Sequence, residues 1–308
     1  MTHGENRPQW YYESRAAGKP NYQIAKAYRP IALLNTLAKV VTALVATDIS
    51  FLVENHHLIP KTHFGGRPGK STIDALHYLS HRIKEAWRKK EVVSVLFLDI
   101  EGAFPNAVTK RLIHNLRKRR IPAKYVKFVE NLLKGRRMRL RFDDYTSEPI
   151  EIRNGIGQGD PLSMILYIIY NADLLEIVDH DKGEDALGYV DDVAILATGK
   201  NYEETTNKIE AIMTKDGGGI KWSREHNSKF EISKSVILHA GRKAQEHDNV
   251  DTQQGEDFPS GGPTLKLNGQ PVQKVKSFKY WWTRSSGGRR KLRKGYQMQL
   301  SGYYNSGD

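Results

Sequence analysis

The chain has 308 residues, of which 48 are Lys or Arg and 35 are Asp or Glu, so its formal net charge is +13. This length gives room for roughly two domains, and the 39% hydrophobic content is too high for a chain that is disordered throughout. The absence of cysteine excludes disulfide frameworks, thiol nucleophiles and cysteine-ligated metals, so any catalytic metal must bind oxygen or imidazole. Because so basic a protein attracts polyanions, nucleic acid is the leading candidate partner.

Helical and strand patterns alternate in the first third of the chain. An apolar periodic run from Leu33 to Leu58 predicts a helix, and Ser71 with Asp74 predicts a capping box at the start of a second helix. The run Val92–Leu98 is apolar and rich in β-branched residues, which is typical of a strand buried on both faces. Asp99 follows directly after this strand.

The rest of the chain predicts further helices and short strands. The apolar stretch Pro161–Val178 follows an acidic N-cap, Asp160, and contains polar residues, so we expect a buried core helix rather than a membrane span. Two apolar strands on either side of an acidic pair predict a hairpin with a charged tip. The other expected helices are Thr109–Lys118, Pro122–Leu133 and Tyr202–Thr214, and the expected strands are Met138–Phe142, Pro149–Arg153, Leu187–Tyr189, Val193–Ala197 and Ser235–His239.

Three carboxylates, Asp99, Asp191 and Asp192, lie where a strand ends or turns. Each by itself has an ordinary explanation as a cap, a turn former or a solvated charge. If the strand ends lie side by side, however, three carboxylates converge with no basic residue next to them in sequence, and such like charges are costly unless a cation holds them. Oxygen ligands favour a hard divalent ion, most naturally Mg²⁺, and a pair of such ions supports nucleotidyl transfer.

Five short segments that include these acids occur in a fixed order: Tyr28–Asn35, Phe64–Thr72, Val95–Asp99, Gly157–Ser163 and Tyr189–Asp192. Together they resemble the fingers and palm motifs of reverse transcriptases, and in particular those of non-LTR (LINE-type) retrotransposons. The resemblance covers roughly residues 20 to 240. It implies an α+β right-hand polymerase fold, in which helices pack behind an antiparallel palm sheet.

The resemblance also implies roles for the acidic residues and one neighbour. Asp99 and Asp191 would be the principal ligands of two Mg²⁺ ions, with Mn²⁺ as a substitute. Asp192 would support the site, and the backbone carbonyl of Ile100 would add a ligand. These four residues form the predicted catalytic and metal-binding set.

Five further residues match positions that contact substrate in this family. Phe104 occupies the place of the aromatic steric gate, which excludes ribonucleotides by a clash with the 2′-hydroxyl. Arg29 matches the fingers arginine that binds triphosphate, a role suited to a planar, permanently charged group. Gln158 and Gly159 lie where the family contacts the incoming nucleotide and the template–primer. Lys234 would act as an acid near the leaving pyrophosphate, and a solvated surface lysine is the alternative.

The composition of the chain divides it into five expected segments. They are an N-terminal extension at 1–19, fingers and palm at 20–240, a polar linker at 241–262, the start of a primer-grip-like hairpin at 263–280 and a basic Gly/Ser-rich tail at 281–308. The chain departs from the family at Pro105, where many relatives carry Asp, and from Trp281 onward. We therefore interpret the tail as out-of-frame sequence or as a genuine basic tail, and the chain as truncated before the thumb.

The expected function is RNA-directed DNA synthesis by two-metal nucleotidyl transfer, in a retrotransposon protein or a defective fragment of one. The expected partners are an RNA template, a DNA primer and deoxynucleoside triphosphates, with no membrane, and the resemblance implies work in the nucleus. The alternative is a catalytically inactive remnant of the polymerase fold that binds nucleic acid through its basic surface.

Overall fold

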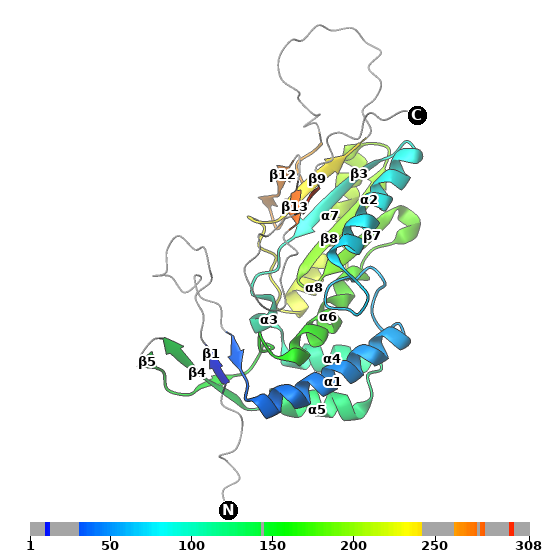
Figure 1. The fold of residues 1–308 in the computed structure, drawn as a ribbon. Helices are drawn as coiled ribbons and strands as arrows, with labels where there is room; N and C mark the ends of the chain where they lie inside the picture. The colour runs from blue at the N-terminus through cyan, green and yellow to red at the C-terminus, as the bar shows by residue number, and fades with distance from the viewer. Residues whose placement is uncertain are drawn as a thin grey trace, which may run out of the picture.

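The computed structural model describes residues 10–12, 31–142, 145–241, 262–275, 278–280 and 296–298, and Figure 1 shows how its elements are arranged. The helices are α1 (Thr36–Asn55), α2 (Thr72–Arg88), α3 (Ala103–Asn106), α4 (Thr109–Lys118), α5 (Ala123–Leu133), α6 (Pro161–Leu175), α7 (Tyr202–Thr214) and α8 (Gly219–Glu225), with a 3-10 turn, η2, at His180–Lys182. The strands are β1 (Trp10–Tyr12), β2 (Ala32–Leu33), β3 (Val92–Leu98), β4 (Arg136–Phe142), β5 (Tyr145–Thr146), β6 (Ile150–Ile152), β7 (Glu184–Tyr189), β8 (Asp192–Gly199), β9 (Val236–Ala240), β10 (Lys266–Leu267), β11 (Gln270–Pro271), β12 (Gln273–Val275), β13 (Phe278–Tyr280) and β14 (Tyr296–Met298).

The main sheet has β3 at its centre, in the strand order β12-β9-β3-β8-β7. β3 pairs antiparallel with β8 on one side and with β9 on the other, and β7 and β8 form an antiparallel hairpin. These strands confirm the antiparallel palm sheet that the family resemblance implies. The edge strand β12 differs, because it pairs parallel with β9. Two parallel strands must be joined by a crossover connection rather than by a hairpin. The polar sequence between β9 and β12 does not predict such a connection.

Both faces of the main sheet are covered, because successive side chains of β3 point to opposite sides. Val95 and Phe97 pack with Leu79 and Ile83 of α2, which runs along one face of the sheet (Figure 1). Leu96 belongs to the larger cluster on the other face, together with side chains of α6 and α7. β3 is therefore buried on both faces, as its uninterrupted apolar sequence predicts.

α6 is the central helix of the larger cluster. It begins at Pro161 after the N-cap Asp160, whose side chain accepts a hydrogen bond from the backbone N–H of Leu162 at 2.9 Å. Side chains all around this helix are buried, as is expected for a helix with apolar residues on every side. The predicted core helix is confirmed, although it ends at Leu175 rather than at Val178.

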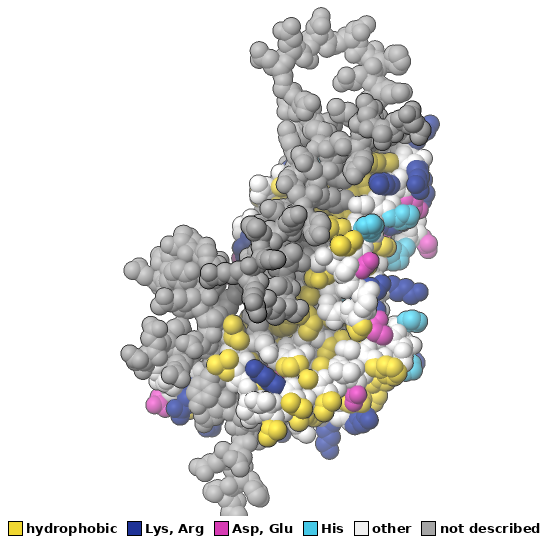
Figure 2. Space-filling view, viewed as in Figure 1, with side chains coloured by type: hydrophobic (Ala, Val, Ile, Leu, Met, Phe, Trp, Pro, Cys, Tyr) yellow, Lys and Arg dark blue, Asp and Glu magenta, His cyan; other side chains and the backbone are white. Residues whose placement is uncertain are grey.

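α1 is the one helix in the described part of the chain that is long and apolar enough to cross a membrane, with a mean hydropathy of 1.7 over its most apolar window. Its inner side packs on α6 through the fully buried Ile49 and Val53. Its outer side exposes Leu37, Leu44 and Phe51. Figure 2 shows hydrophobic side chains gathered over the lower part of the molecule, where α1 lies in Figure 1. α1 is thus anchored on the core along one side and apolar on both.

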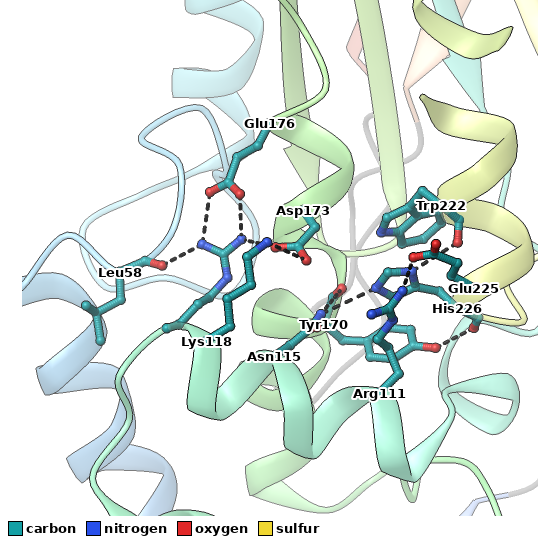
Figure 3. Close-up of polar contacts among 11 residues, drawn as sticks. Leu58, Arg111, Asn115, Lys118, Tyr170, Asp173, Glu176, Trp222, Glu225 and His226 are labelled. Carbon is teal, nitrogen blue, oxygen red and sulfur yellow. Dashed lines mark hydrogen bonds and ion pairs between the residues drawn. The ribbon is translucent and has the colours of Figure 1, made fainter. Parts of the chain in front are cut away.

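A buried arginine joins three parts of the fold (Figure 3). Arg119, at the end of α4, donates to the carbonyl oxygen of Leu58 at 2.7 Å and to the two carboxylate oxygens of Glu176 at 3.0 Å each. It also pairs with Asp173 of α6, and that carboxylate takes a second ion pair from Lys118 at 3.1 Å. Because removing one partner of a buried ion pair leaves a costly charge, Arg119 is a structural residue, although its neighbours in sequence are exposed bases.

Several expected boundaries shift by a few residues or fall outside the described residues. α5 begins at Ala123 because Pro122 is its N-cap rather than its first helical residue. The short helices α3 and α8 were not predicted, since each is too short to show a helical period. Most of the segments expected at 1–19, 241–262 and 281–308 lies outside the described residues. Within 263–280, β10 and β11 form a tight hairpin, and its role in a primer grip stays a prediction.

We predict that the fold loses stability in mild acid, because His63 and His226 are buried in it and His239 is half-buried. Burial lowers the pKa of His226 to about 4, of His239 to about 4 and of His63 to about 3. The unfolded chain binds protons at these sites below about pH 6.5, whereas the folded chain does not until these lower values, so stability falls as the pH falls through this window. His63 and His226 then each contribute a loss of about 2 kcal/mol between pH 7 and pH 5, and the half-buried His239 contributes less because solvent screens its charge.

Urea unfolding at pH 7 and pH 5 tests this prediction on His226, which lies beside Trp222 and Asn115 (Figure 3). His226→Gln removes the titrating group, so the difference in unfolding free energy between the two pH values should shrink by about 2 kcal/mol. The control, His114→Gln, changes an exposed histidine of α4 and should leave the difference unchanged. An undiminished difference in His226→Gln would show that the prediction is wrong.

Candidate active site

The end of β3 brings Asp99 between two neighbouring strands. Leu98, the last residue of β3, pairs with Val193 of β8, and the same register continued by one residue sets Asp99 opposite Asp192. On the other side, Asp99 lies next to the turn that precedes β9, where its N–H donates to Oγ of Ser235 at 3.4 Å. Strand pairing alone therefore brings Asp99 to the tip of the β7–β8 hairpin, which carries Asp191 and Asp192 and is called the acidic hairpin below, although the two segments are far apart in sequence.

Lys234 pairs with the first of the three acids. Its Nζ lies 3.1 Å from Oδ2 of Asp99 and 4.0 Å from the carboxylate of Glu231. The side chains of Lys234 and Asp99 are 64% and 39% exposed. Asp99 has no basic residue next to it in sequence, but Lys234 lies next to it in the folded chain. The predicted role of Lys234 near the pyrophosphate stays a prediction, while its position beside Asp99 is a feature of the structure.

Asp191 and Asp192 lie at the tip of the β7–β8 hairpin. Tyr189 pairs with Asp192, so the loop between the strands consists of Val190 and Asp191. Val190 has a φ of +62°, a left-handed conformation that glycine or asparagine usually adopts. Its carbonyl oxygen accepts a hydrogen bond from Nδ2 of Asn171 in α6 at 2.9 Å. Asp191 is exposed and Asp192 is half-buried, so both carboxylates are accessible to a ligand.

The backbone after Asp99 directs one carbonyl group toward the hairpin. The carbonyl oxygen of Asp99 accepts a hydrogen bond from the N–H of Glu231 at 2.8 Å, and Ile100 forms a bridge with Phe230. Because successive carbonyls of an extended chain point in opposite directions, the carbonyl of Ile100 points away from this segment, to the side on which β8 lies. Ile100, the predicted backbone ligand, therefore faces the acidic hairpin.

Phe104 lies in the short helix α3 and stacks on a tyrosine of the core. The ring centroids of Phe104 and Tyr167 are 4.8 Å apart, with 24° between their planes. Burial raises the pKa of the Tyr167 hydroxyl well above its usual value, and the negative charge of Asp191 raises it further. Tyr167 thus stacks on the predicted gate, and the charge of Asp191 acts on its hydroxyl. A ring held by stacking keeps one preferred orientation, as a steric gate requires.

Gln158 and Gly159 lie in the loop that precedes α6. The carbonyl oxygen of Gln158 accepts a hydrogen bond from the N–H of Ala32 at 2.7 Å. Gly159 has a φ of +106°, and a Cβ there would lie 3.3 Å from the carbonyl oxygen of Ala32. The loop thus packs closely against the fingers strand β2. Arg29, the predicted triphosphate ligand, precedes this strand outside the described residues, so its position stays a prediction.

The donor groups at the acidic hairpin fit a hard divalent cation by their chemistry, because they are all oxygen atoms. Across residues 31–142 and 145–241 and the shorter described segments, no three acidic or histidine side chains lie close enough to form a ready metal cluster. Asp99 instead has Lys234 as its partner, at 3.1 Å. A bound cation would have to draw the carboxylates together.

Sequence analysis missed several residues that surround the hairpin. Tyr167 and Asn171 lie in an apolar helix that the sequence indicates only as core, and the signal was two polar side chains one helical turn apart. A Cβ at Gly65 would lie 2.6 Å from the backbone nitrogen of Val190, so the glycine allows a close approach of two backbones. His63 is fully buried in the same loop, without a sequence signal.

Comparison with known proteins agrees with this geometry. A profile of the reverse transcriptase (RNA-dependent DNA polymerase) family matches residues 17–280. The chain is 31% identical over 227 residues to the probable RNA-directed DNA polymerase from transposon BS of Drosophila melanogaster, covering 72% of this chain and 25% of that relative. It is 26% identical over 260 residues to the RNA-directed DNA polymerase from mobile element jockey of the same species, covering 82% of this chain and 26% of the relative.

A solved structure shares the fold. Telomerase from Candida albicans, in complex with a fragment of telomeric RNA, superposes with a TM-score of 0.53 at 10% identity, covering 75% of this chain and 43% of that one. The chain spans about a quarter of the length of the two curated relatives. The family match nonetheless covers most of the chain, so the resemblance seen in its motifs is confirmed. The chain belongs to the reverse transcriptase family, and its relatives are the RNA-directed DNA polymerases of non-LTR retrotransposons.

Proposed function

We propose that this chain carries the polymerase centre of an RNA-directed DNA polymerase from a non-LTR retrotransposon. The observation that carries the proposal is the register of β3 with β8, which sets Asp99 opposite Asp192 at the acidic hairpin. Membership of the reverse transcriptase family supports nucleotidyl transfer as the reaction class. The names of the relatives support RNA as the template and DNA as the product.

In this proposal, Asp99 and Asp191 hold two Mg²⁺ ions, for which Mn²⁺ can substitute, with help from Asp192 and the carbonyl of Ile100. When bound, the ions would activate the primer 3′-hydroxyl and stabilise the leaving pyrophosphate. Lys234, which pairs with Asp99 at 3.1 Å, would release that carboxylate to the metal. Its ammonium group would then be free to approach the negative charge of the pyrophosphate.

The remaining predicted residues bind the incoming deoxynucleoside triphosphate. Phe104, fixed by stacking on Tyr167, would exclude a 2′-hydroxyl. Arg29 would bind the triphosphate, and the loop with Gln158 and Gly159 would lie against the nucleotide and the template–primer. The net charge of +13 favours a nucleic acid partner over a membrane. We propose nuclear work for the protein because its substrate would be chromosomal DNA.

Primer extension on an RNA template tests the proposed activity. We expect DNA synthesis that depends on Mg²⁺ and that falls by at least about a hundredfold in Asp191→Ala, because a lost metal ligand costs roughly 3 kcal/mol or more in the transition state. The control, Asp181→Ala, removes an exposed carboxylate from η2, before the start of β7, and should leave the rate unchanged. Binding of primer–template should persist in both variants.

The same assay separates the polymerase from the inactive remnant. A folded wild-type chain that binds primer–template but incorporates no nucleotide with Mg²⁺ or Mn²⁺ would contradict the polymerase proposal. That result would leave a nucleic-acid-binding remnant, whose affinity should fall steeply with salt.

The gate assignment predicts a change in sugar selectivity. Phe104→Val removes the ring that would meet the 2′-hydroxyl, so the preference for deoxynucleotides, measured as a ratio of kcat/KM values, should fall roughly tenfold or more. The control, Phe128→Val, shortens a half-buried phenylalanine of α5 and should leave the ratio unchanged. An unaltered ratio in Phe104→Val would refute the gate.

A further inference from the structure

The tip of the acidic hairpin contains a residue that disfavours its own conformation. Of the two loop residues, Val190 has a positive φ, +62°, and Asp191 does not. The positive-φ position of a two-residue hairpin loop usually holds glycine or asparagine. A β-branched residue in the left-handed region is an outlier, and such strain persists only where the surrounding structure enforces it.

One enforcing contact comes from α6. Asn171 is fully buried, and its Nδ2 donates to the carbonyl oxygen of Val190 at 2.9 Å. Its other amide atom, Oδ1, has no hydrogen-bond partner among the residues that the structure describes. A buried polar group with an unmet hydrogen bond is unfavourable, and an apolar side chain of similar shape would fill the same space at less cost. Packing alone therefore does not explain an amide at this position.

A second contact comes from the loop between α1 and α2. The N–H of Phe64 donates to the carbonyl oxygen of Gly188 at 2.7 Å, which attaches the loop to β7 just before the hairpin tip. A Cβ at Gly65 would lie 2.6 Å from the nitrogen and 2.7 Å from Cγ2 of Val190. The backbone at Gly65 therefore lies directly against Val190, and any side chain at position 65 would prevent this contact.

We propose that Asn171 is a positioning residue that fixes Asp191 and Asp192 through the carbonyl group of Val190, with the backbone at Gly65 as the opposing support. The proposal rests on the proposed function of the two aspartates as metal ligands. Adjacent carboxylates repel each other, and Val190 favours a negative φ, so both forces act to open the turn. The hydrogen bond from α6 and the backbone contact oppose them and hold the turn, with its two aspartates, next to the end of β3.

Hydrogen exchange of the full chain, measured by mass spectrometry on peptides that span 186–194, tests without any metal whether Asn171 restrains the turn. Asn171→Leu should speed exchange in this segment at least tenfold, because the turn relaxes. Asn115→Leu is the matched control, since Asn115 is equally buried and donates to the carbonyl oxygen of Tyr170 at 3.2 Å. It should lose stability without a change at the hairpin tip. Gly65→Ala should speed the same exchange and serves if Asn171→Leu fails to fold.

A second substitution distinguishes positioning from general packing. Val190→Gly supplies a residue that adopts the positive φ freely, so adding it to Asn171→Leu should return the exchange at 186–194 to within about threefold of the wild type. A packing defect left by Asn171→Leu would not be repaired by a glycine at the tip. Wild-type exchange in Asn171→Leu, or no recovery in the double variant, would overturn the role of Asn171.

Binding of Mn²⁺, followed by its electron paramagnetic resonance signal, tests whether the restraint of the turn by Asn171 affects metal binding at the proposed site. The wild type should bind Mn²⁺, and Asp191→Ala should lose this binding. Asn171→Leu should weaken the binding about tenfold, and adding Val190→Gly should restore it. Absence of such binding in the wild type would count against the proposed function, whereas equal binding by wild type and Asn171→Leu would count against the positioning role. The two failures are therefore distinguishable.

Discussion

The pairing of β3 with its two neighbours is the constraint on which the site depends. β3 is buried on both faces and bonded along both edges, so its end point cannot shift without breaking a ladder on either side. Asp99 follows this fixed end, where the register with β8 sets it opposite Asp192 and an ion pair joins it to Lys234 from the turn before β9. The position of the first carboxylate is therefore a consequence of sheet formation, and the chemistry at the hairpin depends on core packing far from it.

The ion pair between Asp99 and Lys234 shows how the fold tolerates acids at one point. Both side chains are substantially exposed, and exposed ion pairs contribute little to stability, about 1 kcal/mol or less. Such a pair satisfies the carboxylate while a divalent cation is absent, and it can be exchanged for that cation at low cost. A buried pair, such as that of Arg119 with Asp173, could not be exchanged in this way. Exposure thus separates the ion pair of the proposed site from the structural one.

Sequence reasoning succeeded where a local pattern sets the structure. The capping box of Ser71 and Asp74 and the bounds of β3 follow from neighbouring residues, and the structure confirms both. The contact of Lys234 with Asp99 depends on how distant segments pack together, which no local period encodes. The left-handed conformation of Val190 was also beyond prediction, because a valine at that position argues against it. Its cause lies in tertiary contacts.

α6 is a rigid support that contacts both the predicted sugar gate and the acidic hairpin. Tyr167 stacks on Phe104, and Asn171, one helical turn further, bonds to the carbonyl of Val190. Because the helix is buried on all sides and is tied to α4 near its end by Arg119, the two contacts cannot move independently. The proposed sugar gate and the proposed metal ligands are thus aligned by one element. A change that tilts α6 should disturb selection of the nucleotide and binding of the metal together, whereas a change at either contact should disturb only one.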